Sequence, residues 1–227
     1  MSDSKTVVLV HGAWHGAWCW DKVVALLDEQ GVAVETFDLP MTSFEDDVAA
    51  TKVVLDSVDG DAVLCGHSYG GAVITKAGNH ANVAHLVYLT AFACDADESP
   101  SATATDQDLP ATDLASAFVF HDDGTATLKP ELIVDGFYHD CDPADAAHAQ
   151  RRLRPIHMSC FTTPVGAPAW KTKPSTYVVC TEDRAIHPAL QTYMAGRCTS
   201  SVELATAHSP FLNRPDAVAD LLTGLAT

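Results

Sequence analysis

Short apolar segments recur along the chain and alternate with segments of helical periodicity. Six of them predict strands, at residues 7–10, 32–34, 62–65, 86–89, 177–180 and 202–204. The first, third, fourth and fifth are apolar without alternation, as expected for parallel strands that are covered on both faces. The pattern therefore predicts an α/β fold with a mainly parallel, six-stranded sheet.

Helical patterns lie between the predicted strands. Apolar residues at positions 20, 23, 24 and 27, and again at 218, 221, 222 and 225, share the spacing of one helix face. Ser43, with Asp46 three residues later, indicates a helix start. Residues 69–80 are rich in Ala and Gly, which suits a helix pressed against the sheet. Pro215 suits the first turn of a last helix. Helices are therefore expected to flank the sheet.

The alternation of strands and helices stops after Phe92 and resumes near residue 171. In between, residues 95–115 indicate loop or short helix, residues 118–128 indicate a hairpin around Asp123-Gly124, and residues 143–153 indicate a helix. We interpret residues 94–170 as a cap inserted after the fourth strand. The chain of 227 residues is then a single domain with a core of residues 1–93 and 171–227. Such a cap would cover the sheet edge where ligands bind.

A serine motif follows the third predicted strand. Residues 66–71 read Gly-His-Ser-Tyr-Gly-Gly, between an apolar strand and a helix, which is the context that a Gly-x-Ser-x-Gly nucleophile turn requires. Small residues at positions 66 and 70 let the backbone pass closely and hold the Ser68 hydroxyl above the sheet. Ser68 is therefore the candidate nucleophile.

A serine nucleophile needs a histidine base and an orienting carboxylate. In folds with this motif the order along the chain is serine, acid, histidine. Asp183 follows the fifth predicted strand and His208 follows the sixth, so the carboxyl ends of the strands would bring all three groups to one edge. Glu182 lies beside Asp183 and is the alternative acid.

Two backbone amides are expected to form an oxyanion hole. One is that of Tyr69, just after the nucleophile, and the other is that of Ala13, in the loop after the first strand. Gly12 would permit an unusual backbone angle in that loop. Gly12, Trp14 and Tyr69 are the residues that we expect near the substrate, because of their places in the sequence.

Composition limits the partners of the chain. The formal net charge is −17, from 30 acidic and 13 basic residues, which disfavours nucleic acid and membrane surfaces as partners. The seven cysteines include no Cys-x-x-Cys pair, and buried reduced thiols explain them better than disulfides. No signal peptide or membrane span is visible, so a cytoplasmic location is expected.

No metal and no organic cofactor is expected. Residues 139–142, His-Asp-Cys-Asp, match no zinc or calcium spacing and are interpreted as part of the cap. The oligomeric state stays open, with a homodimer among the alternatives.

The chain resembles the plant methylesterase and hydroxynitrile lyase family, with its bacterial esterase relatives, within the α/β-hydrolase superfamily. The matching stretches are residues 8–18, 66–71, 137–141, 181–186 and 207–211. The resemblance implies an α/β-hydrolase fold, the triad Ser68, Asp183 and His208, and the amides of Ala13 and Tyr69. It also favours Asp183 over Glu182. It implies a lid between strands.

The expected activity is that of a serine hydrolase, which cleaves small carboxylic esters through an acyl-enzyme. The resemblance implies that the lyases of this family carry Thr in place of Gly12 and Lys in place of Ser209, so the esterase branch is favoured. A carbon–carbon lyase acting on cyanohydrins and a small-ligand receptor with an idle triad are the alternatives. Thioesters and lactones are alternative substrates.

Overall fold

The computed structural model describes residues 4–105 and 108–227. Its main sheet has six strands, and all of them pair in parallel. Their order across the sheet is β2-β1-β3-β4-β8-β9. The strands are β1 (Thr6–Val10), β2 (Val34–Thr36), β3 (Ala62–His67), β4 (Val83–Leu89), β8 (Ser175–Cys180) and β9 (Ser200–Leu204). The predicted parallel six-stranded sheet is confirmed, although the second strand begins at residue 34 rather than 32.

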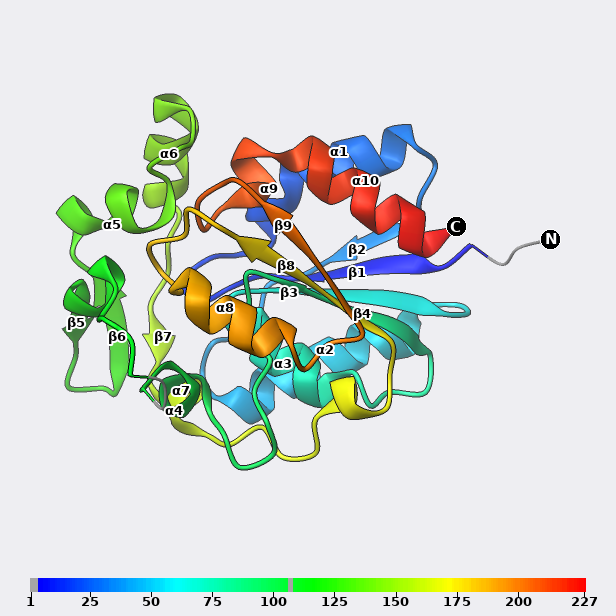
Figure 1. Ribbon diagram of the computed structural model, residues 1–227, viewed down its shortest axis with the longest axis horizontal. Helices are drawn as coiled ribbons and strands as arrows, with labels where there is room; N and C mark the ends of the chain where they lie inside the picture. The colour runs from blue at the N-terminus through cyan, green and yellow to red at the C-terminus, as the bar shows by residue number, and fades with distance from the viewer. Residues whose placement is uncertain (1–3, 106–107) are drawn as a thin grey trace.

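Helices cover both faces of this sheet (Figure 1). The helices α1 (Asp21–Glu29) and α10 (Pro215–Ala226) lie together on one face, with the short η1 (Ala17–Trp20) and α9 (Pro210–Asn213) beside them. The other face carries α2 (Phe44–Ser57), α3 (Tyr69–Ala77) and α8 (Pro188–Ala195). The predicted start of helix α2 is confirmed, since Ser43 is its N-cap residue and the Ser43 side chain accepts a hydrogen bond from the Asp46 amide at 3.1 Å.

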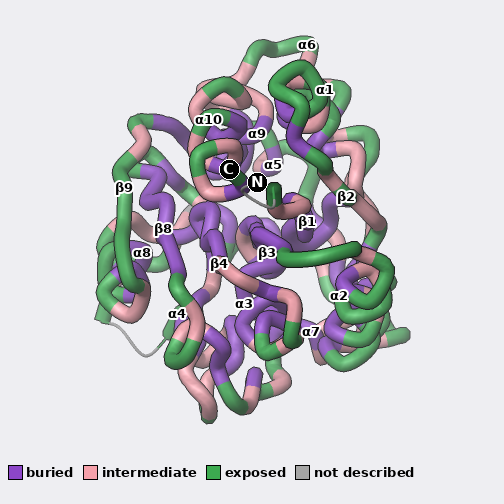
Figure 2. Tube along the Cα trace, turned by 90° about the vertical axis from the view of Figure 1, so that its right-hand side faces the viewer, coloured by how far each residue is buried: buried purple, intermediate pink, exposed green. Residues whose placement is uncertain are grey.

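Two apolar cores result, one on each side of the sheet. Along β1, Val7 and Leu9 pack into the core under α1 and α10, whereas Val8 and Val10 pack into the core under α2 and α3. Every residue of β3 and β8 is buried, and β9 at the edge is largely exposed (Figure 2). Burial on both faces explains why the central strands are apolar without alternation.

The segment between β4 and β8 forms a cap beyond the carboxyl ends of the strands, except for its last element, η3 (Ala169–Lys171), which contacts α3 beside the main sheet (Figure 1). It contains a second, antiparallel sheet in the order β5-β6-β7 and several short helices. Its elements are α4 (Pro100–Thr105), η2 (Asp113–Ser116), β5 (Phe118–Phe120), β6 (Thr125–Leu128), α5 (Pro130–Phe137), α6 (Pro143–Gln150), β7 (Ile156–His157), α7 (Ser159–Thr162) and η3 (Ala169–Lys171). The predicted hairpin and the helix after Pro143 are confirmed. Strand β7 and helix α5 are additions that the sequence did not predict.

Ionic contacts tie the start of the cap to the core. The Arg197 guanidinium, just after α8, donates to both carboxylate oxygens of Glu98 at 2.6 and 2.7 Å and to the Ala93 carbonyl at 2.7 Å. A paired, forked contact of this kind fixes orientation as well as distance.

All seven cysteines are free thiols, as predicted. In the described part of the chain no helix is long and apolar enough to cross a bilayer.

Candidate active site

The turn between β3 and α3 presents Ser68 in a strained backbone conformation. Ser68 has φ 52° and ψ −120°, in a region that a residue with a side chain rarely adopts. The turn is tight: a Cβ on Gly66 would lie 2.5 Å from the Gly70 carbonyl oxygen, and a Cβ on Gly70 would lie 2.6 Å from the Val10 carbonyl oxygen. Only glycine fits at these two positions, which is the physical basis of the motif.

Asp183 and His208 meet at the carboxyl edge of the sheet. His208 Nδ1 lies 2.7 Å from Asp183 Oδ2, and the two side chains are 1% and 0% exposed. Asp183 follows β8 and His208 follows β9, so adjacent parallel strands deliver both groups to the same place. A carboxylate on Nδ1 holds the imidazole in the tautomer that leaves Nε2 free to act as a base.

The Asp183 carboxylate accepts five hydrogen bonds. Its Oδ1 accepts from the amides of Ala185 and Ile186, at 2.6 and 3.0 Å. Its Oδ2 accepts from His208, from Gln191 Nε2 at 2.9 Å and from the Thr90 hydroxyl in a very short contact. This donor set satisfies a buried negative charge. Thr90 and Gln191 were not predicted, and a polar residue directly after β4 was the available signal for Thr90.

Glu182, the alternative acid, points away from this pair. Its side chain is exposed, and its backbone amide donates to the Thr206 carbonyl at 3.1 Å. Asp183 therefore occupies the place beside the histidine that the sequence left open between the two.

His67 brings His208 next to the nucleophile turn. His67, the neighbour of Ser68, donates from Nε2 to the His208 carbonyl at 2.8 Å, and the two rings lie 4.7 Å apart between centroids. On its other side the His208 ring stacks on Phe137 at 5.4 Å. Within the described chain no hydrogen bond joins the Ser68 hydroxyl to His208, and contacts of this kind are often long until substrate binds.

The two predicted oxyanion amides have no acceptor in the described part of the protein. Tyr69 is the first residue of α3, so its N–H has no intrahelical partner. The Ala13 N–H donates none of the backbone hydrogen bonds of the described loops. Both amides are therefore available to stabilise negative charge on an oxygen.

Gly12 has a different role from the one the sequence suggested. Its φ lies outside the left-handed region, so the expected unusual backbone angle was wrong. What Gly12 provides is space, since a Cβ there would lie 2.7 Å from His67 Nδ1 and 2.9 Å from Ser68 Cβ. A larger residue would push against the nucleophile turn.

Cap residues hold the loop that carries Ala13. The Arg154 amide donates to the Trp14 carbonyl at 2.7 Å, and its guanidinium donates to the His15 carbonyl at 2.9 Å. His15 donates from Nδ1 to the Ala13 carbonyl at 2.8 Å and accepts from the Tyr138 hydroxyl at 2.7 Å. The orientation of the Ala13 peptide therefore depends on the cap.

Asp140, in the cap, holds the loop that carries His208 by hydrogen bonds. Asp140 Oδ2 accepts from the Thr206 hydroxyl and the Ala207 amide, both at 2.7 Å, and from Asn213 Nδ2 at 2.9 Å. Residues 139–142 were interpreted only as part of the cap, and no group of three or more His, Cys, Asp or Glu side chains in the described chain is arranged to hold a metal. Their place beside the His208 loop could not be read from the sequence.

Burial keeps the other histidines near the site neutral. It lowers the pKa of His11 to about 4 and that of His15 to about 3, and it lowers the pKa of His67 well below its usual value. Both ring nitrogens of His11 and of His15, and Nε2 of His67, serve as fixed hydrogen-bonding groups in the loops around Ser68, whereas His67 Nδ1 has no partner among the described residues.

A cavity of about 150 Å³ opens over Ser68. It is lined mainly by apolar side chains of the cap and the neighbouring loops: Trp14, Phe92, Pro100, Ala104, Leu114, Ala115, Phe118, Phe161, Ala185 and Ile186, with Ser68, Ser101 and Thr112. Six of these residues also line an outer hollow of about 510 Å³. An apolar cavity with one reactive polar group suits a small ligand.

Of the three residues predicted near the substrate, only Trp14 lines this cavity. The Tyr69 side chain turns away from it, and its hydroxyl donates to Asp47 Oδ2 at 2.6 Å. Burial raises the pKa of both Asp47 and Tyr69. Tyr69 can therefore reach a substrate through its amide but not through its phenol.

The sequence between residues 7 and 221 matches the alpha/beta hydrolase family. The chain belongs to this family. Relatives of this alpha/beta hydrolase include methylesterase 9 of Arabidopsis thaliana, which is 28% identical with 98% of each chain covered. The alpha/beta hydrolase nvfD of Aspergillus novofumigatus is 27% identical, with 97% of this chain and 96% of that protein covered.

Solved structures share the fold of this alpha/beta hydrolase. A pyrethroid hydrolase from Sphingobium faniae superposes with a TM-score of 0.86 at 24% identity, over 98% of this chain and 97% of the other. Polyneuridine aldehyde esterase superposes with a TM-score of 0.86 at 21% identity, over 99% and 100%. The predicted α/β-hydrolase fold and the resemblance to the methylesterase family are confirmed.

Proposed function

We propose that this alpha/beta hydrolase is a serine esterase that cleaves small carboxylic esters with Ser68, His208 and Asp183. The observation that carries the proposal is the buried Asp183–His208 pair, 2.7 Å between Oδ2 and Nδ1, held by His67 beside the strained turn of Ser68. The esterases among the relatives and the apolar cavity over Ser68 support an ester substrate.

The first half of the reaction forms an acyl-enzyme. His208 Nε2 takes the Ser68 proton while the serine oxygen attacks the ester carbonyl carbon. The negative charge that develops on the carbonyl oxygen is stabilised by the N–H groups of Ala13 and Tyr69. His208 then gives its proton to the leaving alcohol as the carbon–oxygen bond to that alcohol breaks.

The second half returns the enzyme to its starting state. His208 takes a proton from water as the water oxygen bonds to the acyl carbonyl carbon, and the N–H groups of Ala13 and Tyr69 stabilise the second oxyanion that forms. The Ser68 oxygen leaves, regains its proton from His208, and the carboxylic acid departs. These steps use groups of the chain and water, and we propose no cofactor, a small-molecule partner and a cytoplasmic location.

Two positions argue against the lyase alternative. The Thr that the resemblance implies for the lyases would place a Cβ within 3 Å of the nucleophile turn, where Gly12 stands here. Ser209, which stands in place of the lyase Lys, is fully buried with its hydroxyl unpaired among the described residues. A lysine ammonium there would be buried at high cost.

The test is hydrolysis of p-nitrophenyl acetate by the wild type, Ser68→Ala and the exposed control Ser201→Ala. We expect Ser68→Ala to lose on the order of 10⁴-fold or more in kcat, because the covalent route is removed. Ser201→Ala should hydrolyse at the wild-type rate. Wild-type activity in Ser68→Ala refutes the proposal, and tight binding of small esters without turnover by the wild type favours a receptor.

A further inference from the structure

Trp14 separates two hollows of the protein. On one side lies the cavity of about 150 Å³ over Ser68, and on the other lies a hollow of about 460 Å³ within the cap. Among the described lining residues, Trp14 is the one shared by both. The indole is therefore the wall between them.

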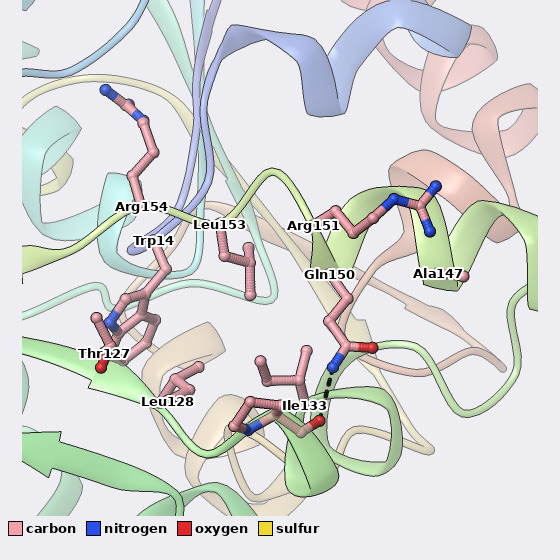
Figure 3. A pocket seen from close by; sticks show the side chains of 10 residues that line it. Trp14, Thr127, Leu128, Ile133, Ala147, Gln150, Arg151, Leu153 and Arg154 are labelled. Atoms are coloured by element: carbon pink, nitrogen blue, oxygen red, sulfur yellow. Dashed lines mark hydrogen bonds between the residues drawn. The ribbon is translucent and has the colours of Figure 1, made fainter.

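The larger hollow, which we name the cap hollow, is mostly apolar. It is lined by Trp14, Thr127, Leu128, Pro130, Ile133, Ala147, Gln150, Arg151, Leu153 and Arg154. Figure 3 shows Trp14, Leu128, Ile133 and Leu153 around a common space, with Gln150 directed to the Pro130 carbonyl, 2.7 Å away. An alkyl chain that entered this space would meet apolar groups along most of its length.

The wall is held firmly in place. Trp14 is 3% exposed, and its Nε1 donates to the Ala126 carbonyl at 3.0 Å. Its ring packs against Phe118 at 5.2 Å and Phe161 at 5.4 Å between centroids. Rotation of the ring would break these contacts and cost free energy. The cavity over Ser68 therefore ends at Trp14.

We propose that Trp14 sets the length of the acyl group that this enzyme accepts, and that the cap hollow is a closed-off extension of the acyl site. The proposal rests on the proposed esterase function. It makes the natural substrates short-acyl esters, because the acyl group is confined to the side of the cavity that ends at Trp14, while the outer hollow of about 510 Å³ is left for the alcohol.

The placement of His208 assigns the acyl group, rather than the alcohol, to the Trp14 side. His208 must protonate the leaving alcohol, so the alcohol lies on its side of the ester. In the described chain the Phe137 ring lies between the two groups, since it stacks on the His208 ring at 5.4 Å and lies 6.1 Å from the Trp14 ring. The Trp14 ring is closer to Phe118 and Phe161, on the side of Phe137 away from His208 in this chain of contacts. The acyl group then points from Ser68 toward the indole.

Glycine is the substitution that opens the wall with least strain. Trp14 has φ 62°, a left-handed conformation that glycine adopts freely and other residues adopt at a cost. Trp14→Gly therefore removes the indole and relieves the backbone together. Trp14→Leu is the second variant, and Trp18→Ala, outside both hollows, is the control for loss of an aromatic side chain.

The experiment measures kcat/KM for p-nitrophenyl acetate, butyrate, hexanoate and octanoate, with acetates of methanol, butanol and octanol as the alcohol series. We expect Trp14→Gly to raise the octanoate-to-acetate ratio at least about tenfold, and Trp14→Leu to raise it less. Trp18→Ala should keep the wild-type ratio. Adding Leu153→Trp to Trp14→Gly should narrow the cap hollow and reduce the gain.

An unchanged acyl ratio in both folded Trp14 variants, or a gain in the alcohol series instead, overturns the proposal while the esterase function stands. Absence of ester hydrolysis by the wild type is a different result, which refutes the esterase function and the acyl site with it. Melting temperatures show which variants are folded.

Discussion

Replacing Asp183 with Asn tests whether the carboxylate acts through its charge and its hydrogen bonds. Asn keeps the shape of Asp183 and can still accept from the amides of Ala185 and Ile186 with its Oδ1. Its NH₂ group then stands where Oδ2 now accepts from His208, Gln191 and Thr90. The hydrogen-bond donors of His208, Gln191 and Thr90 would then face the donating NH₂ group of the substituted side chain at a fully buried position.

The histidine can relieve this conflict only by changing its tautomer. If His208 Nδ1 accepts from the new amide, its proton sits on Nε2, and the ring can no longer take the Ser68 proton. We expect kcat to fall about 10⁴-fold, which corresponds to roughly 5.5 kcal/mol in the barrier. One N–H of Gln191 Nε2 loses its acceptor, although Nε2 still donates to the Ile186 carbonyl at 2.8 Å. The lost acceptor should lower the free energy of unfolding by about 1–3 kcal/mol.

The assay is hydrolysis of p-nitrophenyl acetate, with ¹⁵N NMR of the imidazole nitrogens to report the tautomer. Glu182→Gln is the matched control, because Glu182 is the neighbouring carboxylate and its side chain is exposed. It should keep wild-type activity and stability. Activity of Asp183→Asn within tenfold of the wild type, or an equal loss in Glu182→Gln, would refute the reasoning.

Three further predictions follow from the site. Asp140→Ala removes the acceptor of two donors on the His208 loop and of Asn213 at the end of α9. We expect kcat to fall at least about tenfold with little change in KM. An equal loss in kcat from the exposed control Asp142→Ala would contradict this. Burial lowers the pKa of His11 to about 4 and that of His15 to about 3, below their values in the unfolded chain. The unfolded chain therefore binds more protons between pH 6.5 and 4, so the melting temperature should fall as pH falls through that window, and a flat profile would be inconsistent. Gly12→Ala puts a Cβ 2.9 Å from Ser68 Cβ. Activity should therefore fall while the far-ultraviolet circular dichroism stays unchanged. Full activity would show that the nucleophile turn can accommodate the extra Cβ.

Much of the fold follows from local patterns in the sequence. Strands β1, β3, β4 and β8 were predictable because both faces of each are covered, which leaves an apolar run. The edge strand β2 has residues of mixed exposure, and its start was misplaced by two residues. Helix α5 was not predicted, because Ile133, Val134 and Gly136 lower its intrinsic helix propensity and packing against η2 has to compensate.

The site was predictable where the backbone determines it. The glycines around Ser68 and the positions of Asp183 and His208 after consecutive strands are properties of the chain order. The direction of a side chain is not such a property. Tyr69 was expected near the substrate from its place in the sequence, but its side chain does not line the cavity over Ser68 and its hydroxyl donates to Asp47. The contact of Asp140 with the His208 loop joins segments 66 residues apart and depends on how the cap folds back.

The most direct test of the central claim is the site of reaction with a fluorophosphonate, read by mass spectrometry of the digested protein. The probe labels a serine only where a base activates it and an oxyanion hole stabilises the adduct. We predict one adduct, on the peptide that contains Ser68, and its loss in His208→Ala. An adduct on another serine, or no adduct on the folded wild type, would contradict the assignment of Ser68 as the nucleophile.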